Sequence, residues 1–307
     1  MSSPTSEALV TLGRWYVRNA PNGVGTGALA GRYLNPHLRD EPRKRVTETA
    51  IGASFAVDTQ DLIQRYLYLF GVWEPRMTRW LQRRLKPGDT FVDVGANIGY
   101  FSVLASRLVG PQGRVVAIEA SQDFTRRLAQ NAALNGCENI RVAQTAVSDK
   151  QQTLTFILSS SANMGANSIV PWDGPVESTF EIEAFPLPDV LEADEIAKAR
   201  VIKVDVEGAE GGVVRGMAPL LDRLRPDAEV TVEVTPDRMA QLGDSVDELL
   251  DTMRDHGFHV YRLANEYAAA TYPTALRGPA AVPIRWRGPV DGESDLIFSR
   301  VDAEKLP

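Results

Sequence analysis

Short apolar runs alternate with longer segments of helical periodicity over most of this chain. The runs are rich in Val, Ile and Phe and end at polar or glycine-containing segments, which is typical of strands buried on both faces. They lie at residues 90–94, 114–119, 140–147, 201–206 and 229–234. The segments with helical periodicity lie at 122–134, 189–199, 212–224 and 245–256. This alternation predicts an α/β fold in which helices cover both faces of a mostly parallel sheet.

Three further segments are expected beside this core. Residues 258–263 and 295–300 are expected to form a closing hairpin-like pair, and 154–158 a strand outside the core order. Residues 159–175 are dominated by Ser, Asn, Gly and Pro, which predicts a long surface loop.

The chain before residue 90 has two predicted parts. Residues 1–60 are interrupted by Pro21 and by four glycines between 23 and 31, so we expect an irregular N-terminal extension. Residues 61–85 carry apolar side chains near helical spacing, with a break at Gly71 and Pro75. They predict two helices that form a lid beside a ligand site. The predicted main domain, 61–307, comprises this helical lid, a core at 90–265, a late loop at 270–292 and a last strand at 293–301.

Composition narrows the class of protein. With 307 residues, of which 44% are hydrophobic, the chain can bury a sizeable core. The net charge of −7 argues against nucleic acid as a partner. Cys137 is the only cysteine, which excludes an intrachain disulfide and a thiolate zinc cluster. No apolar run approaches the roughly 18 residues of a membrane span, so we expect no membrane partner and a cytoplasmic location, and leave a homo-oligomer open.

The segment Phe91–Tyr100 combines a buried strand with a glycine-containing turn. Gly95 lies where the chain must turn sharply, and its missing side chain allows positive φ and close approach of a ligand. Gly99 is expected to open the next helix, whose free N–H groups face the ligand. Glu119 ends the following strand, 119 − 95 = 24 residues after Gly95. An acidic residue at about this spacing can accept hydrogen bonds from a ribose diol.

The glycine spacing separates two classes of nucleoside-binding protein. Dinucleotide-binding oxidoreductases favour Gly-x-Gly-x-x-Gly, whereas this loop reads Asp93-x-Gly95-x-x-x-Gly99 with Asn97 between the glycines. A site for S-adenosylmethionine has no pyrophosphate to accommodate, so the loop favours this cofactor.

A second polar cluster ends the run at 201–206. Lys203, Asp205 and Glu207 would share one face of an extended chain until Gly208 breaks the strand. Ligands of open α/β sheets bind at the carboxyl ends of the strands, and burying these charges without a role would be costly. The carboxylates are therefore catalytic candidates, with Glu210 either a further member or a charge at a helix N-terminus.

Three segments together resemble the FkbM family of methyltransferases: Asp93–Tyr100, Ala146–Asp149 and Lys203–Glu210. Trp73-Glu74-Pro75 is similar to that family's aromatic-Glu-Pro element, and 161–168 to its Asn/Gly/Ser loop. The resemblance implies a class I, Rossmann-like methyltransferase fold with a seven-stranded sheet. It also implies S-adenosylmethionine-dependent O-methylation of a hydroxyl on a sugar or natural product, within secondary metabolite biosynthesis.

The resemblance further implies roles for single residues. The residues implied to hold the cofactor are Glu74, Asp93, Gly95, Asn97, Gly99, Tyr100, Glu119, Ala146 and Asp205. Those implied to lie beside the transferred methyl group are Asp205, Glu207 and Glu210.

Two ways of removing the acceptor proton remain open. In the first, which we favour, Asp205 is a general base tuned by Glu207 or Lys203. In the second, Asp205, Glu207 and Glu233 hold Mg²⁺ or Ca²⁺, which acidifies the hydroxyl. No histidine lies near these carboxylates in the sequence to strengthen a metal site.

The alternative functions differ in the acceptor or in the ligand. Within the same fold, N- or carboxyl-methylation is the nearest alternative to O-methylation. A catalytically idle protein that binds S-adenosylmethionine is a second alternative, although Asp93, Glu119 and Asp205 are all present. A nicotinamide-dependent oxidoreductase is a third, and the glycine spacing opposes it.

Overall fold

The computed structural model describes residues 4–20, 23–158, 168–170, 176, 178–265 and 267–306. The chain forms two compact units. The first contains the described residues up to Arg79 together with the segment Asn265–Ala280, and the second contains the remaining described residues. The loop predicted at 159–175 lies almost wholly outside the described residues.

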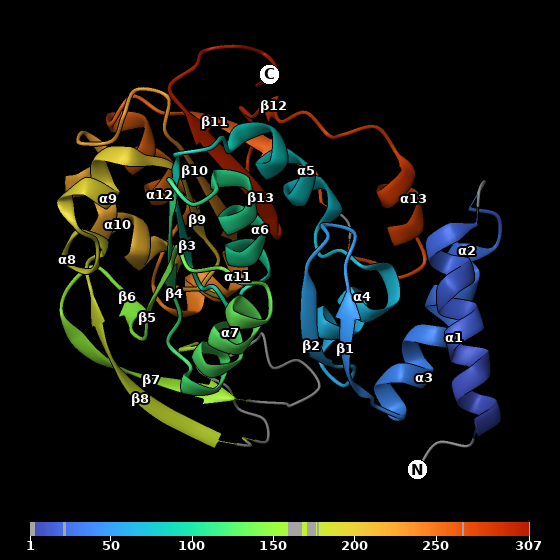
Figure 1. The fold of residues 1–307 in the computed structure, drawn as a ribbon. Helices are drawn as coiled ribbons and strands as arrows, with labels where there is room; N and C mark the ends of the chain where they lie inside the picture. Colours follow the sequence, from blue (N-terminus) through green and yellow to red (C-terminus); the bar gives the residue numbers. More distant parts are fainter. Residues whose placement is uncertain are drawn as a thin grey trace. The chain divides into compact units, whose positions relative to one another are not determined.

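The second unit is built on one large sheet (Figure 1). Over the described residues this sheet has eight strands in the order β12-β11-β13-β10-β9-β3-β4-β5. Their bounds are β3 Thr90–Val94, β4 Arg114–Ile118, β5 Ile140–Ala143, β9 Ala199–Val204, β10 Glu229–Val234, β11 His259–Leu263, β12 Ile284–Arg285 and β13 Ser294–Ser299. The five strands from β10 to β5 are parallel, and β13 is antiparallel to both β10 and β11.

This strand order confirms the predicted class I methyltransferase fold. Without the two-residue strand β12, the order is that of the predicted seven-stranded, mostly parallel sheet, closed by an antiparallel pair. The central parallel strands β3, β9 and β10 are largely buried, and Val92, Ile202 and Val230 have no exposed surface, whereas the residues of the edge strand β5 are all partly exposed. Short segments rich in Val and Ile are therefore the correct signature of these central strands.

Helices cover both faces of this sheet (Figure 1). One face carries α6 (Tyr100–Val109) and α7 (Gln122–Leu134), and the other carries α8 (Leu187–Val190), α10 (Glu210–Leu221) and α12 (Val246–Asp255). Short polar side chains set where two of them begin, because Ser121 and Ser245 accept hydrogen bonds from Phe124 N and Asp247 N. Two shorter helices are α9 (Ala193–Lys198) and α11 (Pro236–Gln241).

Several predicted elements have different bounds in the structure. The strand predicted at 140–147 is two strands, because β6 (Ala146–Val147) leaves the main sheet for a three-stranded sheet with β8 (Ser178–Phe185) and β7 (Gln152–Leu158). The helix predicted at 189–199 is divided into α8 and α9, since a capping box at Glu192 and Glu195 starts a new helix. Strand β9 ends at Val204, two residues earlier than predicted.

The first unit is regular, so the expectation of an irregular segment at 1–60 is wrong. Its described elements before residue 60 are α1 (Pro4–Asn19), α2 (Thr26–Ala28), the π-helix η1 (Leu29–Leu34), α3 (Asn35–Asp40) and the antiparallel hairpin of β1 (Lys44–Glu48) and β2 (Ser54–Asp58). The glycines end and restart helices there: Gly25 has φ +71 and precedes α2 directly. Propensity rules find such breaks but not the helices around them.

The two helices predicted at 61–85 are confirmed. They are α4 (Leu62–Phe70), which ends at Gly71 with φ +78, and α5 (Pro75–Arg84), which begins at the proline. The late loop predicted at 270–292 contains a helix, α13 (Tyr272–Arg277), and the strand β12. In the first unit the Tyr272 ring packs on Tyr66 and Phe70, which attaches α13 to α4. No helix in the described part of the chain is long and apolar enough to cross a membrane.

Candidate functional site

The carboxyl ends of β3, β4 and β9 meet at one edge of the large sheet. The backbone N–H groups of Gly95 and Ala96 both donate to the Ile118 carbonyl, each at 3.0 Å. On the other side of β3, Asp205 N donates to the Val94 carbonyl at 3.0 Å. The two polar segments identified in the sequence are therefore adjacent at the edge where ligands of open α/β sheets bind.

Position 95 requires glycine, because the neighbouring loop after β9 leaves no room for a side chain. Its φ is +85, and a Cβ atom at this position would lie 1.8 Å from the Asp205 carbonyl oxygen. Gly99 has φ +84, and its Cβ would lie 2.8 Å from Leu128 Cγ on α7. From the sequence, Gly95 was expected to allow a turn and close approach of a ligand. The structure confirms the turn and adds the contact with the loop after β9.

Left-handed backbone occurs at predicted site residues. Among the described residues other than glycine, those with positive φ are Glu74, Asn97 and Glu207, at +40, +51 and +55. Such conformations cost free energy and cluster at functional sites. All three residues belong to the set predicted from the sequence.

Glu119 lies directly after β4 and holds the turn that follows β3. Its Oε2 accepts the Asn97 N–H and its Oε1 accepts the Ser121 N–H, both at 2.8 Å. The side chain is almost completely buried, and this burial raises the pKa of Glu119 to about 7 despite the two hydrogen bonds. The residue is therefore held in place by the backbone on both sides of the site.

Asp93 lies beneath this turn within β3. It is 1% exposed, and its Oδ2 accepts the Ser102 hydroxyl at 2.6 Å. Burial raises its pKa to about 6, against the charge of Lys203, which is its register partner on β9. The Asp93 carboxylate thus orients the start of α6 through Ser102.

Lys203 and Asp205 form an ion pair at the end of β9. The Lys203 ammonium is buried and donates to Asp205 Oδ2 at 2.7 Å. The same ammonium lies 4.9 Å from the centre of the Phe101 ring, a cation–π contact. Asp205 itself keeps more than a quarter of its side chain exposed. A partly exposed carboxylate beside a buried, fixed cation is poised to interact with a ligand.

The expectation that Lys203, Asp205 and Glu207 share one strand face is wrong, because β9 ends before Asp205. The Glu207 carboxylate instead pairs with Arg238 of α11, and its carbonyl accepts the Ser168 hydroxyl at 2.7 Å.

Glu210 starts α10. It is 1% exposed, its Oε1 accepts the Gly208 N–H at 2.8 Å, and burial raises its pKa to about 7. This position corresponds to the alternative of a helix N-terminus. Asp205 and Glu207 are both partly exposed, but Glu207 pairs with Arg238, whereas Asp205 lies beside the Gly95 turn.

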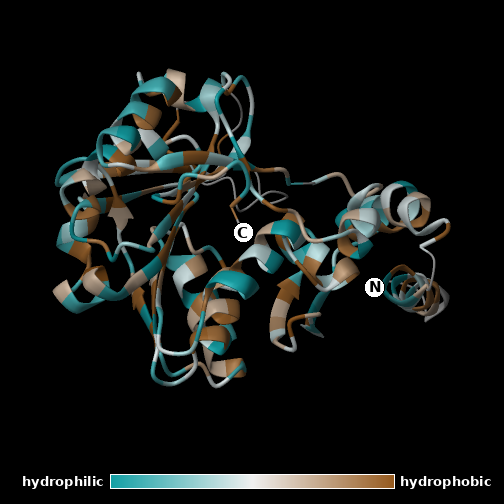
Figure 2. Cartoon of the chain, turned by 90° about the horizontal axis from the view of Figure 1, so that it is seen from above, coloured by the Kyte–Doolittle hydropathy of each residue, from teal (hydrophilic) through white to brown (hydrophobic). Residues whose placement is uncertain are grey.

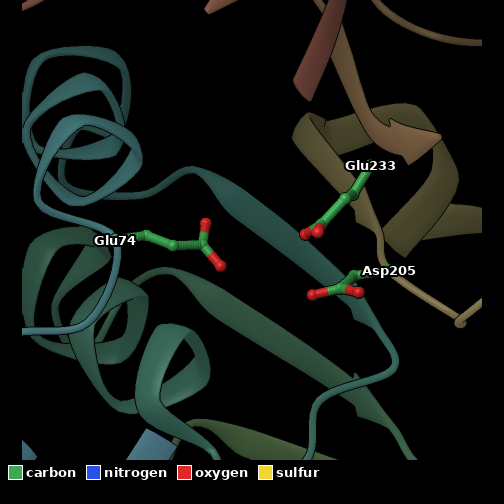
Figure 3. A group of neighbouring side chains, drawn as sticks. All are labelled: Glu74, Asp205 and Glu233. Carbon is green, nitrogen blue, oxygen red and sulfur yellow. The ribbon is translucent and has the colours of Figure 1, made fainter. Parts of the chain in front are cut away.

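Glu233 supplies a second carboxylate close to Asp205. It precedes the last residue of β10, and the two carboxylates offer oxygens within 4.8 Å of each other (Figure 3). Figure 3 also draws Glu74, which is buried in the first unit.

The other predicted cofactor residues have structural surroundings of their own. Tyr100 begins α6 and packs its ring edge-on against Phe101 at 5.2 Å. Ala146 is buried in β6, where it pairs with Ala184 of β8. Arg238 was not predicted as a site residue, because only the placement of α11 after β10 brings its guanidinium to Glu207. Ser102 and Ser121 were not predicted either, since in the sequence they look like ordinary helix residues.

Comparison with known proteins agrees with this architecture. The family model of the Methyltransferase FkbM domain matches residues 93–260, which is more than half of the chain. The hexuronic acid methyltransferase AglP of Haloferax volcanii is 26% identical over 218 residues, covering 70% of this chain and 86% of that protein. A protein-L-isoaspartate O-methyltransferase of Triticum aestivum is 28% identical over 165 residues, 54% of this chain and 67% of that protein.

Solved structures with similar folds are more distant. A putative rRNA methylase from Clostridium thermocellum covers 77% of this chain and 98% of its own, with a TM-score of 0.44 and 10% identity. An S-adenosylmethionine-dependent O-methyltransferase from Thermotoga maritima covers 85% of this chain and 78% of its own, with a TM-score of 0.42 and 14% identity.

Proposed function

We propose that this chain, which belongs to the FkbM family of S-adenosylmethionine-dependent methyltransferases, methylates a hydroxyl group of a sugar or natural-product small molecule. The observation that carries the proposal is the partly exposed Asp205 carboxylate beside the Gly95 turn. It lies at the same edge of the sheet as Glu119. The name of the relative AglP, a hexuronic acid methyltransferase, supports a sugar acceptor.

Glu119 has the acceptor capacity that a ribose diol requires. A carboxylate offers about four lone-pair sites, and the N–H groups of Asn97 and Ser121 use one on each oxygen. One site on each oxygen is left for a hydroxyl. The Gly95 and Gly99 turn, fixed between β3 and α6, would accommodate the rest of the nucleoside.

Asp205 would accept the proton of the hydroxyl. Bound S-adenosylmethionine supplies an electrophilic methyl group on sulfur. As the acceptor oxygen bonds to that carbon, the carbon–sulfur bond breaks and its electron pair stays on sulfur. The hydroxyl proton passes to Asp205 Oδ1, while Oδ2 keeps its hydrogen bond from Lys203. Holding the two reacting atoms together can itself supply about 7–11 kcal/mol.

The residues fit a metal-assisted route poorly. Of the three carboxylates considered for Mg²⁺, Glu207 is paired with Arg238. The Lys203 ammonium lies 2.7 Å from Asp205 and would repel a cation bound there. A metal-free route, in which Asp205 accepts the proton, fits these residues better.

The affinity for S-adenosylhomocysteine is expected to rise about tenfold between pH 6 and pH 8. Only the ionised form of Glu119 accepts hydrogen bonds with both oxygens, and its pKa of about 7 leaves it mostly protonated at pH 6 and mostly ionised at pH 8. Glu119→Gln should bind S-adenosylhomocysteine more weakly, with an affinity that does not change over this pH range. Calorimetric titrations across this range measure both proteins, and equal pH dependence in the two would assign the titration to another group.

The acceptor atom is found by product analysis. The protein is incubated with S-adenosylmethionine carrying an isotopically labelled methyl group and a panel of sugars with free hydroxyls, amines or carboxylates. The label is expected as a methoxy group on a sugar carbon, identified by NMR. Label found only on nitrogen or as a methyl ester would contradict O-methylation of a hydroxyl and favour the N- or carboxyl-methylation alternative.

A further inference from the structure

Helix α1 turns its charged residues toward the protein. In the first unit, Arg14 donates to the Tyr68 carbonyl at 2.6 Å, and Arg18 donates to carbonyls including that of Leu67 at 2.7 Å. Glu7, near the start of the helix, pairs with Arg43 at 2.8 Å. The side of α1 that packs on the unit therefore contains the charges of the helix together with the buried residues Val10 and Val17.

The opposite side of α1 is uncharged and largely apolar. The large hydrophobic residues exposed on it are Leu9 at 65%, Leu12 at 63%, Trp15 at 59% and Tyr16 at 38%. The other residues exposed between 8 and 19 are Ala8, Thr11 and Asn19. Figure 2 shows hydrophobic residues in this helix, which lies beside the label N. Contiguous exposed apolar surface of this kind marks an interaction site.

We propose that this outer face of α1 (Leu9, Leu12, Trp15 and Tyr16) binds the same face of a second copy of the chain, in a symmetric homodimer. A two-fold interface brings one patch against itself, so the patch must be self-complementary. The outer face meets this condition because none of its exposed residues carries a charge. Large side chains about one turn apart can interdigitate across an antiparallel helix pair.

The available area agrees with such a pairing. The four exposed side chains leave on the order of 500 Å² per copy, so a symmetric contact would bury roughly 1,000 Å² in total, the lower limit for a specific interface. Val24, which is 72% exposed, extends the face, since Tyr16 Oη donates to its carbonyl at 2.7 Å. A membrane surface is the less suitable occupant. In-plane helices carry Lys and Arg on their polar face, and the arginines of α1 bond carbonyls of the first unit.

The oligomeric state in solution tests the proposal. Sedimentation and light scattering of the full chain are expected to give a mass of 2 × 33.7 = 67.4 kDa. Leu12→Glu should raise the dimer dissociation constant by about 100-fold or more, because it buries two like charges at the contact. Leu134→Glu is the matched control, since Leu134 is a 47% exposed residue of α7 in the second unit, and it should remain dimeric. Circular dichroism and S-adenosylhomocysteine binding verify that each variant is folded.

A cysteine cross-link gives a second readout that does not depend on loss of function. In a Cys137→Ser background, Leu12→Cys is expected to form a disulfide-linked dimer on mild oxidation, and Leu134→Cys is not. A wild-type chain that stays monomeric at concentrations on the order of 100 μM, or that dimerises unchanged in Leu12→Glu, would overturn the proposal. So would a monomer that floats with lipid vesicles, which would make a membrane the occupant of this face.

Discussion

The variant Asp205→Asn is expected to lower kcat by about 100- to 10,000-fold, the range of a lost general base. Asparagine keeps an oxygen that can accept a hydrogen bond from the Lys203 ammonium, so the end of β9 should retain its conformation. It cannot take the hydroxyl proton at neutral pH. The affinity for S-adenosylhomocysteine should change by no more than about twofold, because the proton acceptor does not hold the nucleoside. Single-turnover kinetics and calorimetry measure the two quantities separately.

A matched amide substitution controls for loss of charge. Asp222 lies at the end of α10, and its exposed carboxylate pairs with His256. Asp222→Asn removes one negative charge from the same unit and should leave kcat unchanged. If Asp205→Asn lost cofactor binding together with turnover, Asp205 would be a cofactor residue and not the base.

The variant Gly95→Ala is expected to destabilise the second unit by about 3 kcal/mol or more and to abolish cofactor binding. Its Cβ would lie 1.8 Å from the Asp205 carbonyl oxygen, which is backbone and cannot rotate away. Relief requires that the β3 turn and the β9 loop separate. Urea unfolding and S-adenosylhomocysteine titration of the folded fraction measure the two effects.

Gly136→Ala separates this clash from backbone strain. Gly136 has φ +63, but a Cβ there would meet no atom within 4 Å. Its substitution should cost about 1–2 kcal/mol, the penalty of left-handed backbone alone. Equal stability losses at Gly95 and Gly136 would show that the contact with Asp205 carries no weight.

The sequence predicted the fold well where one signal dominates. Short Val-rich segments placed β3 and β10 at their observed bounds, because strands in the middle of a covered sheet bury their valines. Helical periodicity placed α7 at Gln122–Leu134, where Ser121 caps its start. These patterns are local, so they can be recognised in the sequence without knowledge of tertiary contacts.

The prediction failed where distant contacts decide. Residues 1–60 are helical and hairpin structure despite their glycines, because α1 is held by arginine bonds to carbonyls of α4. Strand β6 leaves the main sheet to pair with β8, a partner some 40 residues away. Neither contact leaves a periodic trace in the sequence.

The candidate site was predicted in its parts but not in its connections. Glu119 and Asp205 follow β4 and β9 at one sheet edge, as their positions after predicted strands indicated, and Asp93 lies near the carboxyl end of β3 between them. Pairing between residues from different elements was not predictable from the sequence. The main example is the ion pair between Arg238 and Glu207, which gives Glu207 a different partner from that of Asp205. Motif spacing reports which residues follow a strand, whereas ion pairing depends on how the loops meet.

Titration of the purified chain with S-adenosylhomocysteine at pH 8, beside Glu119→Ala, tests the central claim most directly. The account predicts micromolar binding by the wild type, weakened in the variant by about 1.5–3 kcal/mol, the contribution of a hydrogen bond to a charged group. Wild-type protein that does not bind, or a Glu119→Ala variant that binds equally well, would contradict a cofactor site at the ends of β3 and β4.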